Sequence, residues 1–562
     1  MPTVAGVGDA DARRAADARA VGGARERSGA GPALLVAVVV LAAAGIVALI
    51  GLRGNFPLSD DWSYAFAVRG LCESGTLHML PWTGASLVLQ AGYGAALCAL
   101  FGFSFEVLRL STLVLATSGV IAFLLLLRTL GVRGATLALG VLLFALNPLF
   151  VNLAFTFMTD VPFVVAATWA GYAYARGLSQ RSIGLVLVGS LAASAAFLIR
   201  QHGIVVALAA AVAAVLATDW PRAQRRRAAL AALLLPVLTF VAFHVWLFAL
   251  HGAPSGYTNK ISEAHRLSAA GLVNCLFRGL EYLGLFLAPL AVALPLRGTR
   301  RRLTVAATAL LAALAVALYL REGTLMFSLT NVLYDFGLGP LSLRDTLFLG
   351  GAPPVHLGPW LQVPLTIVTI AAAGAITVAW TSSVVRPRSA AHAFTALAAA
   401  MLFGSSLLHT RYYFDRYLLA VVPFLVAAVL ASDRLRRLPL ALTLAALLGW
   451  YAVAGTHDYL AWNRARWAAL DSLTAAGTPA TAIDGGMEFN AWTLAPTLDR
   501  WPSDADVRPG QSDTRHSWWW VVDDRFVVAF APLRGYRVYA EVPFTRWLVP
   551  GHDRVLLLER DE

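Results

Sequence analysis

The chain has 562 residues, of which 58% are hydrophobic and only 14% are charged. Soluble domains carry about 25% charged residues, so this composition excludes an ordinary soluble protein and indicates many membrane-spanning helices. The net charge of +12 would fit a nucleic-acid binder, but the arginine positions described below assign it to membrane orientation instead.

Residues 1–31 are rich in alanine, glycine and arginine and predict a disordered cytoplasmic tail. Beyond them, apolar stretches found with a window of about 19 residues predict about thirteen membrane spans. These stretches lie near 32–52, 106–128, 134–153, 161–176, 183–199, 203–218, 228–250, 271–296, 303–320, 361–381, 392–409, 413–431 and 438–455.

The arginines test this topology independently, because positive residues concentrate in short cytoplasmic loops. If the spans alternate from a cytoplasmic N-terminus, every short inner loop contains arginine. The sequence therefore predicts a multi-pass protein of the cytoplasmic (plasma) membrane with an extracytoplasmic C-terminal region. The loop arginines are Arg128, Arg133, Arg176, Arg181, Arg222, Arg225, Arg226, Arg227, Arg297, Arg300, Arg301, Arg302, Arg386, Arg388, Arg434, Arg436 and Arg437.

Three outer segments are longer than ordinary connectors. Residues 53–105 include an apolar, glycine-rich stretch, 85–103, which predicts a helix at the membrane interface. Residues 321–360 are rich in glycine and proline. Residues 456–562 are numerous enough for a small α+β domain. The predicted fold is thus an all-α polytopic membrane module, residues 32–455, followed by a small extracytoplasmic α+β domain.

An acidic pair, Asp60 and Asp61, follows the first span and precedes Tyr64. Burial and mutual repulsion both oppose ionisation of two adjacent carboxylates at a membrane surface. Such a pair can accept a proton from a nucleophile or bind a divalent cation. The alternative is a solvated loop that caps the next helix.

Asp160 lies between the third and fourth spans, which places it on the same outer face as the acidic pair. It is also well placed to cap the fourth span, with Pro162 in the first helical turn. The two interpretations are compatible, because a capping aspartate can still present an oxygen to a substrate.

Two basic groups occupy other outer ends of spans. Arg200 and His202 interrupt an apolar stretch between the fifth and sixth spans, while Arg411, Arg416 and Tyr417 open the twelfth. Interfacial arginine requires an anionic partner, and a phosphate fits the guanidinium fork well. The alternatives are an ion pair between Arg416 and the aspartate beside it, and arginines that reach to lipid headgroups.

Other cofactor signals are missing from the sequence. Cys72, Cys98 and Cys275 form no CxxC pair, which argues against a disulfide framework and a cysteine-built zinc site. The histidines lack HExxH spacing, and there is no phosphate-binding loop, dinucleotide fingerprint or GxSxG elbow. Metal binding is left undetermined, with a divalent cation at the acidic residues as one alternative.

The order and sidedness of these features resemble one family. They are an arginine-bearing tail, a single span, the acidic pair, an interfacial helix ending in residues 100–106, Arg109, the outer Asp160 and a later Arg416-Tyr417 segment. This arrangement resembles the C superfamily of membrane glycosyltransferases. Within it, the likeness is to the dolichyl-phosphate-mannose–protein mannosyltransferases and the lipid A aminoarabinose transferases, over about residues 30–455.

The family motif of Asp-Glu followed by Tyr falls on Asp60, Asp61 and Tyr64. Its second acidic residue falls on Asp160, and its basic corner between spans five and six falls on Arg200, followed by His202. Many relatives carry Lys-Pro before the interfacial helix, with the lysine near the donor phosphate. This chain has Leu80-Pro81-Trp82 there, so Arg200, Arg411 or Arg416 would have to supply the positive charge.

The resemblance implies transfer of a sugar from a polyprenyl-phosphate donor to an acceptor at the outer face of the membrane. Asp60 would be the general base in an inverting reaction. Asp61 and Asp160 would orient the sugar or acceptor, or help to hold a divalent cation. The acceptor is open between glycan, lipid and protein, and no nucleic acid is implied. The rival hypotheses are a polytopic transporter or lipid flippase and a non-catalytic assembly protein of the cell envelope.

Overall fold

The computed structural model describes residues 31–264, 266–323, 331–351, 354–356, 358–409, 413–495, 521 and 524–561. The chain divides into two units, Met1–Gly45 and Ile46–Glu562. All of the predicted tail except its last residue lies outside the described residues, as do Arg411 and the tryptophans at 518–520.

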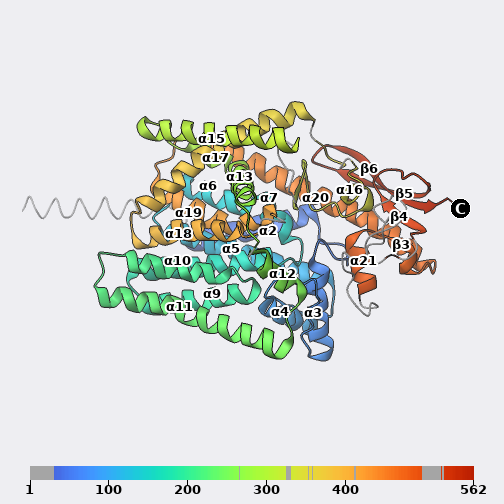
Figure 1. Cartoon of the computed structure of the whole chain (residues 1–562), viewed down its shortest axis with the longest axis horizontal. Coiled ribbons are helices and arrows are strands. Elements are labelled where there is room, and N and C mark those ends of the chain that lie inside the picture. The colour runs from blue at the N-terminus through green and yellow to red at the C-terminus, as the bar shows by residue number, and fades with distance from the viewer. Residues whose placement is uncertain are drawn as a thin grey trace, which may run out of the picture. The chain divides into compact units, whose positions relative to one another are not determined.

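Helices dominate both halves of the described chain (Figure 1). The first half contains α2 (Pro32–Ile50), α3 (Asp61–Ser74), α4 (Val88–Phe101), α5 (Phe105–Thr129), α6 (Gly134–Ala145), α7 (Pro148–Ala154), α8 (Asp160–Gln180), α9 (Ile183–Ile199), α10 (Gly203–Leu216), α11 (Arg222–Val245), η1 (Trp246–His251) and α12 (Ser255–Ala264). The second half contains α13 (Ala269–Phe286), α14 (Ala288–Ala293), α15 (Gly298–Glu322), α16 (Arg344–Leu347), α17 (Pro359–Val385), α18 (Ala390–Ser406), η2 (Asp415–Ala420), α19 (Val421–Ser432), α20 (Leu438–Ala475), η3 (Ala480–Ala482) and α21 (Met487–Leu494).

Each of the thirteen predicted segments coincides with a helix or a pair of consecutive helices. Among the described residues, seven helices are long and apolar enough to cross a membrane, or eight if the pair α6 and α7, bent by 52°, forms one span. The apolar helices α9, α10 and α18 have 17, 14 and 17 residues, fewer than the roughly 20 that cross a hydrocarbon layer unaided. The chain is therefore a helical, multi-span membrane protein, and the count of thirteen stays a prediction.

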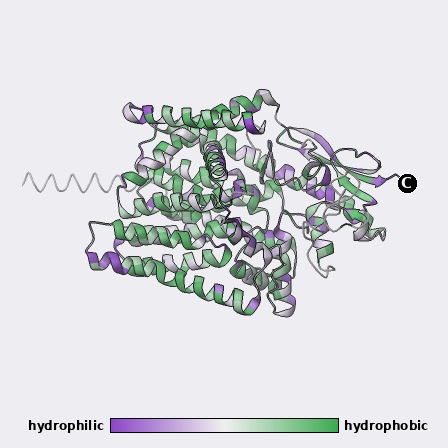
Figure 2. Cartoon of the chain, in the orientation of Figure 1, coloured by the Kyte–Doolittle hydropathy of each residue, from purple (hydrophilic) through white to green (hydrophobic). Residues whose placement is uncertain are grey.

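Hydrophobic residues predominate along the long helices, as the colours of Figure 2 show. On α11, for example, Leu230, Leu234 and Leu238 are more than half exposed. Between helices the packing is close: a Cβ atom on Gly189 of α9 would lie 2.6 Å from the ring of Tyr174 on α8. Exposed apolar faces around a tightly packed interior are expected of helices that meet lipid outside and small residues inside.

The C-terminal region contains a four-stranded sheet with the order β3-β4-β6-β5. Strand β3 pairs in parallel with β4, and the other pairs are antiparallel. The 38-residue helix α20 continues through the predicted domain boundary at residue 455 and packs on the sheet through a shared apolar core. A small C-terminal sheet is therefore present in the region where an α+β domain was predicted. The strands are β3 (Ile483–Asp484), β4 (Phe526–Ala529), β5 (Tyr536–Arg546) and β6 (Gly551–Arg560).

A short hairpin, β1 (Leu333–Tyr334) and β2 (Gly337–Leu338), precedes α16. The carboxylate of Asp415 accepts hydrogen bonds from the backbone N–H groups of Val332 and Leu333. On the other side, Arg344 of α16 forms an ion pair with Asp524, next to the sheet. These contacts connect the start of η2 to the C-terminal sheet through residues 332–344.

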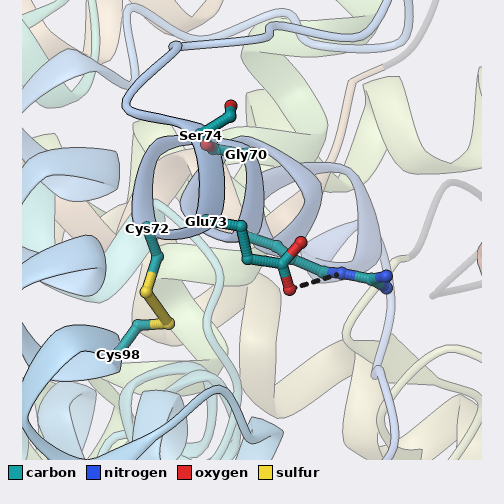
Figure 3. The surroundings of a disulfide bond; sticks show 6 residues. Gly70, Cys72, Glu73, Ser74 and Cys98 are labelled. Atoms are coloured by element: carbon teal, nitrogen blue, oxygen red, sulfur yellow. Dashed lines mark hydrogen bonds and ion pairs between the residues drawn. A yellow bond between two sulfur atoms is a disulfide. The ribbon is translucent and has the colours of Figure 1, made fainter.

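A disulfide joins Cys72 of α3 to Cys98 of α4 (Figure 3). The sequence argued against a disulfide framework, and it did not predict this single bond. The two residues are 26 positions apart, and the packing of α3 against α4 brings them together, which the spacing in the sequence does not show. Among the described residues Cys275 is a free, buried cysteine.

Candidate functional site

The acidic pair lies where the outer loop turns into α3. Ser59 adopts a left-handed backbone conformation with φ of 57°, which a residue other than glycine adopts at a cost of about 1–3 kcal/mol. Its N–H donates to Glu488, 3.1 Å away, and this contact holds the turn. Asp60 immediately precedes the helix, and Ser63 bonds its carbonyl oxygen. The strained turn therefore fixes the backbone from which Asp60 projects.

The two carboxylate oxygens of Asp60 have different neighbours. Its Oδ1 accepts a hydrogen bond from Trp82 Nε1 at 3.1 Å, whereas its Oδ2 lies 3.1 Å from Arg416 Nη2. The Asp60 side chain is 16% exposed. A carboxylate held from both sides but still reached by solvent is a suitable acceptor for a proton from a bound hydroxyl group.

Asp160 is the first residue of α8 and forms an ion pair with Arg200, which ends α9. Both side chains are more than nine-tenths buried. Asp160 Oδ1 takes the Arg200 contact, while its Oδ2 has no hydrogen-bond partner in the part of the chain described. The Arg200 guanidinium also lies over the ring of Tyr417, 5.8 Å from its centroid. Asp160 thus keeps one buried oxygen for a ligand.

Several of these side chains line a small, partly open cavity. It opens between the starts of α8 and α10, the end of α18, and η2. Both polar and apolar residues line it: Asp160, Phe163, Arg200, His202, Leu402, Ser405, Ser406, Arg416, Tyr417, Leu419 and Ala420. The predicted residues Asp160, Arg200, His202, Arg416 and Tyr417 therefore share one site.

Arg416 carries the least satisfied charge in this cavity. Its Nη2 contacts Asp60, but Nε and Nη1 have no hydrogen-bond partner among the described residues, although Arg416 is only 7% exposed. The alternative of an ion pair with Asp415 is wrong, because that carboxylate accepts hydrogen bonds from backbone N–H groups, including that of Arg416 itself. A buried guanidinium with open donors is a strong site for an oxyanion.

Asp61 has a different environment from Asp60. It is completely buried, and its two oxygens accept hydrogen bonds from the backbone N–H groups of Leu58 at 2.7 Å and Phe157 at 3.0 Å. Burial raises the pKa of Asp61 to about 7, although Arg109 and these backbone groups act in the opposite direction. This geometry suits a residue that holds the loop in place better than one that contacts sugar or metal.

Tyr64 and His202 both lie in the site. Tyr64 is one turn after Asp60 on α3, and burial raises its pKa well above the usual range, so the phenol stays protonated at neutral pH. Burial lowers the pKa of His202 well below its usual value, and His202 Nδ1 lies 3.1 Å from Ser405 Oγ. Both residues can therefore act as neutral hydrogen-bonding groups.

Lys260, the one lysine of the chain, reaches the same site from α12. Its side chain crosses Gly84 so closely that a Cβ there would lie 2.7 Å from Lys260 Nζ. Burial lowers its pKa to about 7; nearby Arg200 and Arg416 lower it further, while Asp60 and Asp160 raise it. The N-terminus of α12 is held by a 2.7 Å hydrogen bond from Gly256 N to Pro81 O. An ammonium group thus stands close to the Pro81 segment, where the sequence lacks the expected lysine.

Sequence reasoning missed three of these residues. Lys260 had a signal, because a single lysine among 44 basic residues is unusual. Trp82 had a weaker one, as an aromatic residue at the point of departure from the family pattern. Glu488, which bonds Ser59, had none, since it lies 429 positions away in sequence.

Metal binding receives no positive support from the described side chains. Among them, no group of three or more histidine, cysteine, aspartate or glutamate residues is placed to hold a metal ion. The predicted phosphate ligand Arg411 lies outside the described residues.

Residues 93–246 match the family model described as dolichyl-phosphate-mannose-protein mannosyltransferase. The predicted resemblance to this glycosyltransferase family is confirmed. The matched segment contains Asp160, Arg200 and His202, whereas Asp60, Lys260 and Arg416 lie outside it.

Three solved structures show looser likenesses. The Pmt1-Pmt2 protein O-mannosyltransferase complex of S. cerevisiae is 19% identical, with 41% of this chain and 34% of that chain covered and a TM-score of 0.31. The Archaeoglobus fulgidus oligosaccharyltransferase is 14% identical, with 75% and 56% covered and a TM-score of 0.38. ArnT from Cupriavidus metallidurans is 15% identical, with 94% and 97% covered and a TM-score of 0.35.

This chain thus spans about a third of the yeast chain and little more than half of the archaeal one. ArnT is also known in a structure bound to undecaprenyl phosphate. No curated protein sequence matches the chain.

Proposed function

We propose that this chain is an integral-membrane glycosyltransferase that moves a sugar from a polyprenyl-phosphate donor to an acceptor hydroxyl at the outer face of the cytoplasmic membrane. The family match over residues 93–246 supports the reaction class. The Nε and Nη1 of Arg416 carry the proposal, because they are buried beside the held carboxylate of Asp60 and have no hydrogen-bond partner among the described residues. They supply an oxyanion site and a base within one cavity.

The donor phosphate is assigned to three cations. Arg416 and Arg200 line the cavity, and Lys260 lies within electrostatic range of both. Together they would bind the phosphodiester and offset the charge that grows on it as the bond to sugar breaks. In this proposal Lys260 takes the place of the lysine that relatives carry before the interfacial helix, which explains how the site works with Leu80 at that position.

The reaction is a single displacement. The acceptor oxygen forms a bond to the anomeric carbon of the sugar, its proton passes to Asp60, and the bond between that carbon and the phosphate oxygen breaks. The bonding electrons leave with the polyprenyl phosphate, so the configuration inverts. Asp160 uses its open Oδ2 to orient a sugar hydroxyl, and His202 with Ser405 provides neutral hydrogen-bonding groups on the cavity wall. Asp61 holds the loop and does not touch substrate.

The topology belongs to the same proposal. About thirteen spans in the arrangement of this glycosyltransferase superfamily, with a cytoplasmic N-terminus, place Asp60, Asp160, Arg200 and the C-terminal sheet outside the cytoplasm. The Cys72–Cys98 disulfide supports this sidedness, because disulfides persist in oxidising compartments and are rare in the cytosol. A reporter fused after Glu562 should be active only outside the cytoplasm, and activity inside would contradict an odd number of spans.

The decisive experiment uses purified full-length protein in lipid nanodiscs with a mixture of polyprenyl-phosphate sugars, and it measures product masses. We expect one sugar to be transferred, and we expect Asp60→Asn to lower the rate by about 10²–10⁴-fold, the usual contribution of a general base. Donor binding should survive in this variant. Glu73→Gln, on the exposed part of the same helix, is the matched control. Transfer at the wild-type rate by Asp60→Asn would overturn the role of Asp60.

The transporter or flippase hypothesis makes the opposite prediction. A flippase would move labelled polyprenyl-phosphate sugar across a vesicle membrane without changing its mass, with or without Asp60. The charged groups of the site gather at helix ends rather than along one helix, which favours the transferase.

A further inference from the structure

Trp82 lies at the accessible side of the proposed base. Its indole is 38% exposed, whereas the neighbouring Trp62 is fully buried with its ring centroid 6.1 Å away. The indole N–H donates to Asp60 Oδ1. A large, partly exposed aromatic side chain is therefore held against the proposed base by contacts with a buried tryptophan and with the carboxylate of Asp60.

The two carboxylate oxygens of Asp60 face different groups, which defines two sides of the proposed site. Oδ2 faces Arg416, which lines the cavity together with Asp160 and Arg200. Oδ1 faces Trp82, whose side chain is partly exposed. In an inverting displacement, the attacking oxygen and the leaving phosphate oxygen lie on opposite sides of the anomeric carbon. If the phosphate occupies the arginine side, the acceptor must approach from the side of Trp82.

We propose that Trp82 is the acceptor-binding platform and that the acceptor is a carbohydrate. The inference rests on the proposed function and names the substrate class at that same site. Because the indole N–H is engaged by Asp60, the exposed part of Trp82 offers chiefly apolar ring surface. A sugar ring carries an apolar C–H face for this surface and, at its edge, hydroxyl groups that reach a carboxylate.

Charge separates this acceptor from an anionic one. An acceptor phosphate would bring a negative group beside Asp60 on the side away from Arg416, and like charges in a poorly solvated site repel strongly. A neutral sugar hydroxyl avoids this repulsion and loses its proton only as the new bond forms. A peptide hydroxyl is also neutral, but a serine or threonine side chain is too small to cover the indole while its oxygen reaches Asp60.

Binding can be measured without turnover. Full-length protein in nanodiscs would be titrated with three probes: neutral methyl hexosides, a threonine-containing peptide and a monosaccharide phosphate. Saturation-transfer NMR reports contact with each probe. Trp82→Phe keeps an aromatic face without the N–H, and Trp82→Leu removes the face. We expect methyl hexosides to bind the wild type, to bind Trp82→Phe within about threefold, and to bind Trp82→Leu at least tenfold more weakly.

Trp450 provides the matched control. It is 55% exposed on α20, in the predicted final membrane span, so Trp450→Phe and Trp450→Leu should change no probe. Equal binding of hexosides by the wild type and Trp82→Leu, or no hexoside binding to the wild type, would overturn the proposal. The proposal would also be overturned if binding of the peptide or of the monosaccharide phosphate, and not binding of the hexosides, depended on Trp82.

Turnover measurements then distinguish the role of Trp82 in binding the acceptor from its role in holding Asp60. Trp82→Leu should raise the acceptor KM at least tenfold with little change in the donor KM. Trp82→Phe should lower kcat, because Asp60 loses the hydrogen bond that holds its carboxylate in place. Failure of the proposed function has a different signature, namely no sugar transfer and no binding of polyprenyl phosphate, while hexoside binding is read independently.

Discussion

Asp60 and Asp61 are chemically identical and adjacent, yet they belong to different parts of the molecule. Asp61 is enclosed, with both oxygens bonded to backbone N–H groups. Asp60 faces side chains only, Trp82 on one oxygen and Arg416 on the other. The contrast shows that the partners of a buried charge, more than its burial, indicate whether it supports the fold or serves a substrate.

Each aspartate lies near an arginine whose hydrogen-bond partners are of the same kind as its own. Arg109, the electrostatic partner of Asp61, donates from both terminal nitrogens to the backbone carbonyls of Gly54 and Phe56. Arg416 donates to Asp60 from one terminal nitrogen and leaves two nitrogens without partners in the described structure. Backbone groups cannot leave with a product, so the first pair is suited to a permanent role, whereas we propose that a ligand completes the second.

The strongest test of this contrast is Arg109→Met. Removing one partner of a buried charge pair costs about 3–5 kcal/mol, because the remaining charge is left uncompensated. We expect a large fall in melting temperature in detergent, with the donor KM of the folded fraction nearly unchanged.

The double variant Arg109→Met with Asp61→Asn should recover part of this loss, since it removes both charges. If Arg109→Met were as stable as the wild type but failed to bind donor, the assignment of the two pairs would be reversed.

Removing the disulfide near the C-terminal end of α3 should also affect stability and not donor binding. Cys72→Ser should destabilise the protein by about 2–4 kcal/mol, because the unfolded chain loses the constraint of a closed loop. Donor KM should stay constant, since neither cysteine lies at the cavity. The wild type treated with reductant should melt like the variant. A wild type that is unaffected by reductant would show that the bond does not form in the native protein.

Arg416 should respond in the opposite way to Arg109. A charge-assisted hydrogen bond contributes about 1.5–3 kcal/mol, so Arg416→Met should raise the donor KM by roughly 10–100-fold. Arg416→Lys should recover less than half of this, because it lacks the planar fork. Arg69→Met removes the positive charge of an exposed side chain on α3, and it serves as the control for loss of charge alone. A large fall in melting temperature without a change in donor KM would place Arg416 in the support group.

The architecture could be predicted largely from the sequence, because hydrophobic length and arginine placement are local signals. All thirteen apolar segments coincide with helices or helix pairs, and the C-terminal α+β region was also predicted. The bend between α6 and α7 and the continuity of α20 beyond residue 455 were not. The bend lies where Asn147 caps α7 ahead of Pro148, and the continuity of α20 goes with its packing on the C-terminal sheet; hydropathy records neither.

The residues that lie together in the site could be predicted, but their different roles could not. Asp60, Asp160, Arg200 and Arg416 do lie together. The role of Asp61 depends on the backbone of Phe157, which is 96 positions away. Lys260 arrives from a helix whose place is set by a contact with Pro81. Long-range contacts of this kind leave no pattern in a single sequence.

The smallest expected effect is the pH dependence that Lys260 confers on donor binding. Burial lowers its pKa to about 7, so the ammonium is present below pH 7 and is lost as the pH rises through that value. Donor phosphate prefers the charged form. The donor kcat/KM, which reports the free enzyme, should therefore fall by about tenfold between pH 6.5 and 8.5.

Arginine at this position keeps its charge throughout that range, so Lys260→Arg should remove the fall, while Lys260→Met should show the low value at all pH values. Asp61 also titrates near pH 7, but it is present in all three proteins. The difference between the wild type and Lys260→Arg therefore isolates the lysine. Identical profiles for these two proteins would mean that Lys260 does not bind phosphate. The donor phosphate would then have to be bound by Arg200 and Arg416 alone.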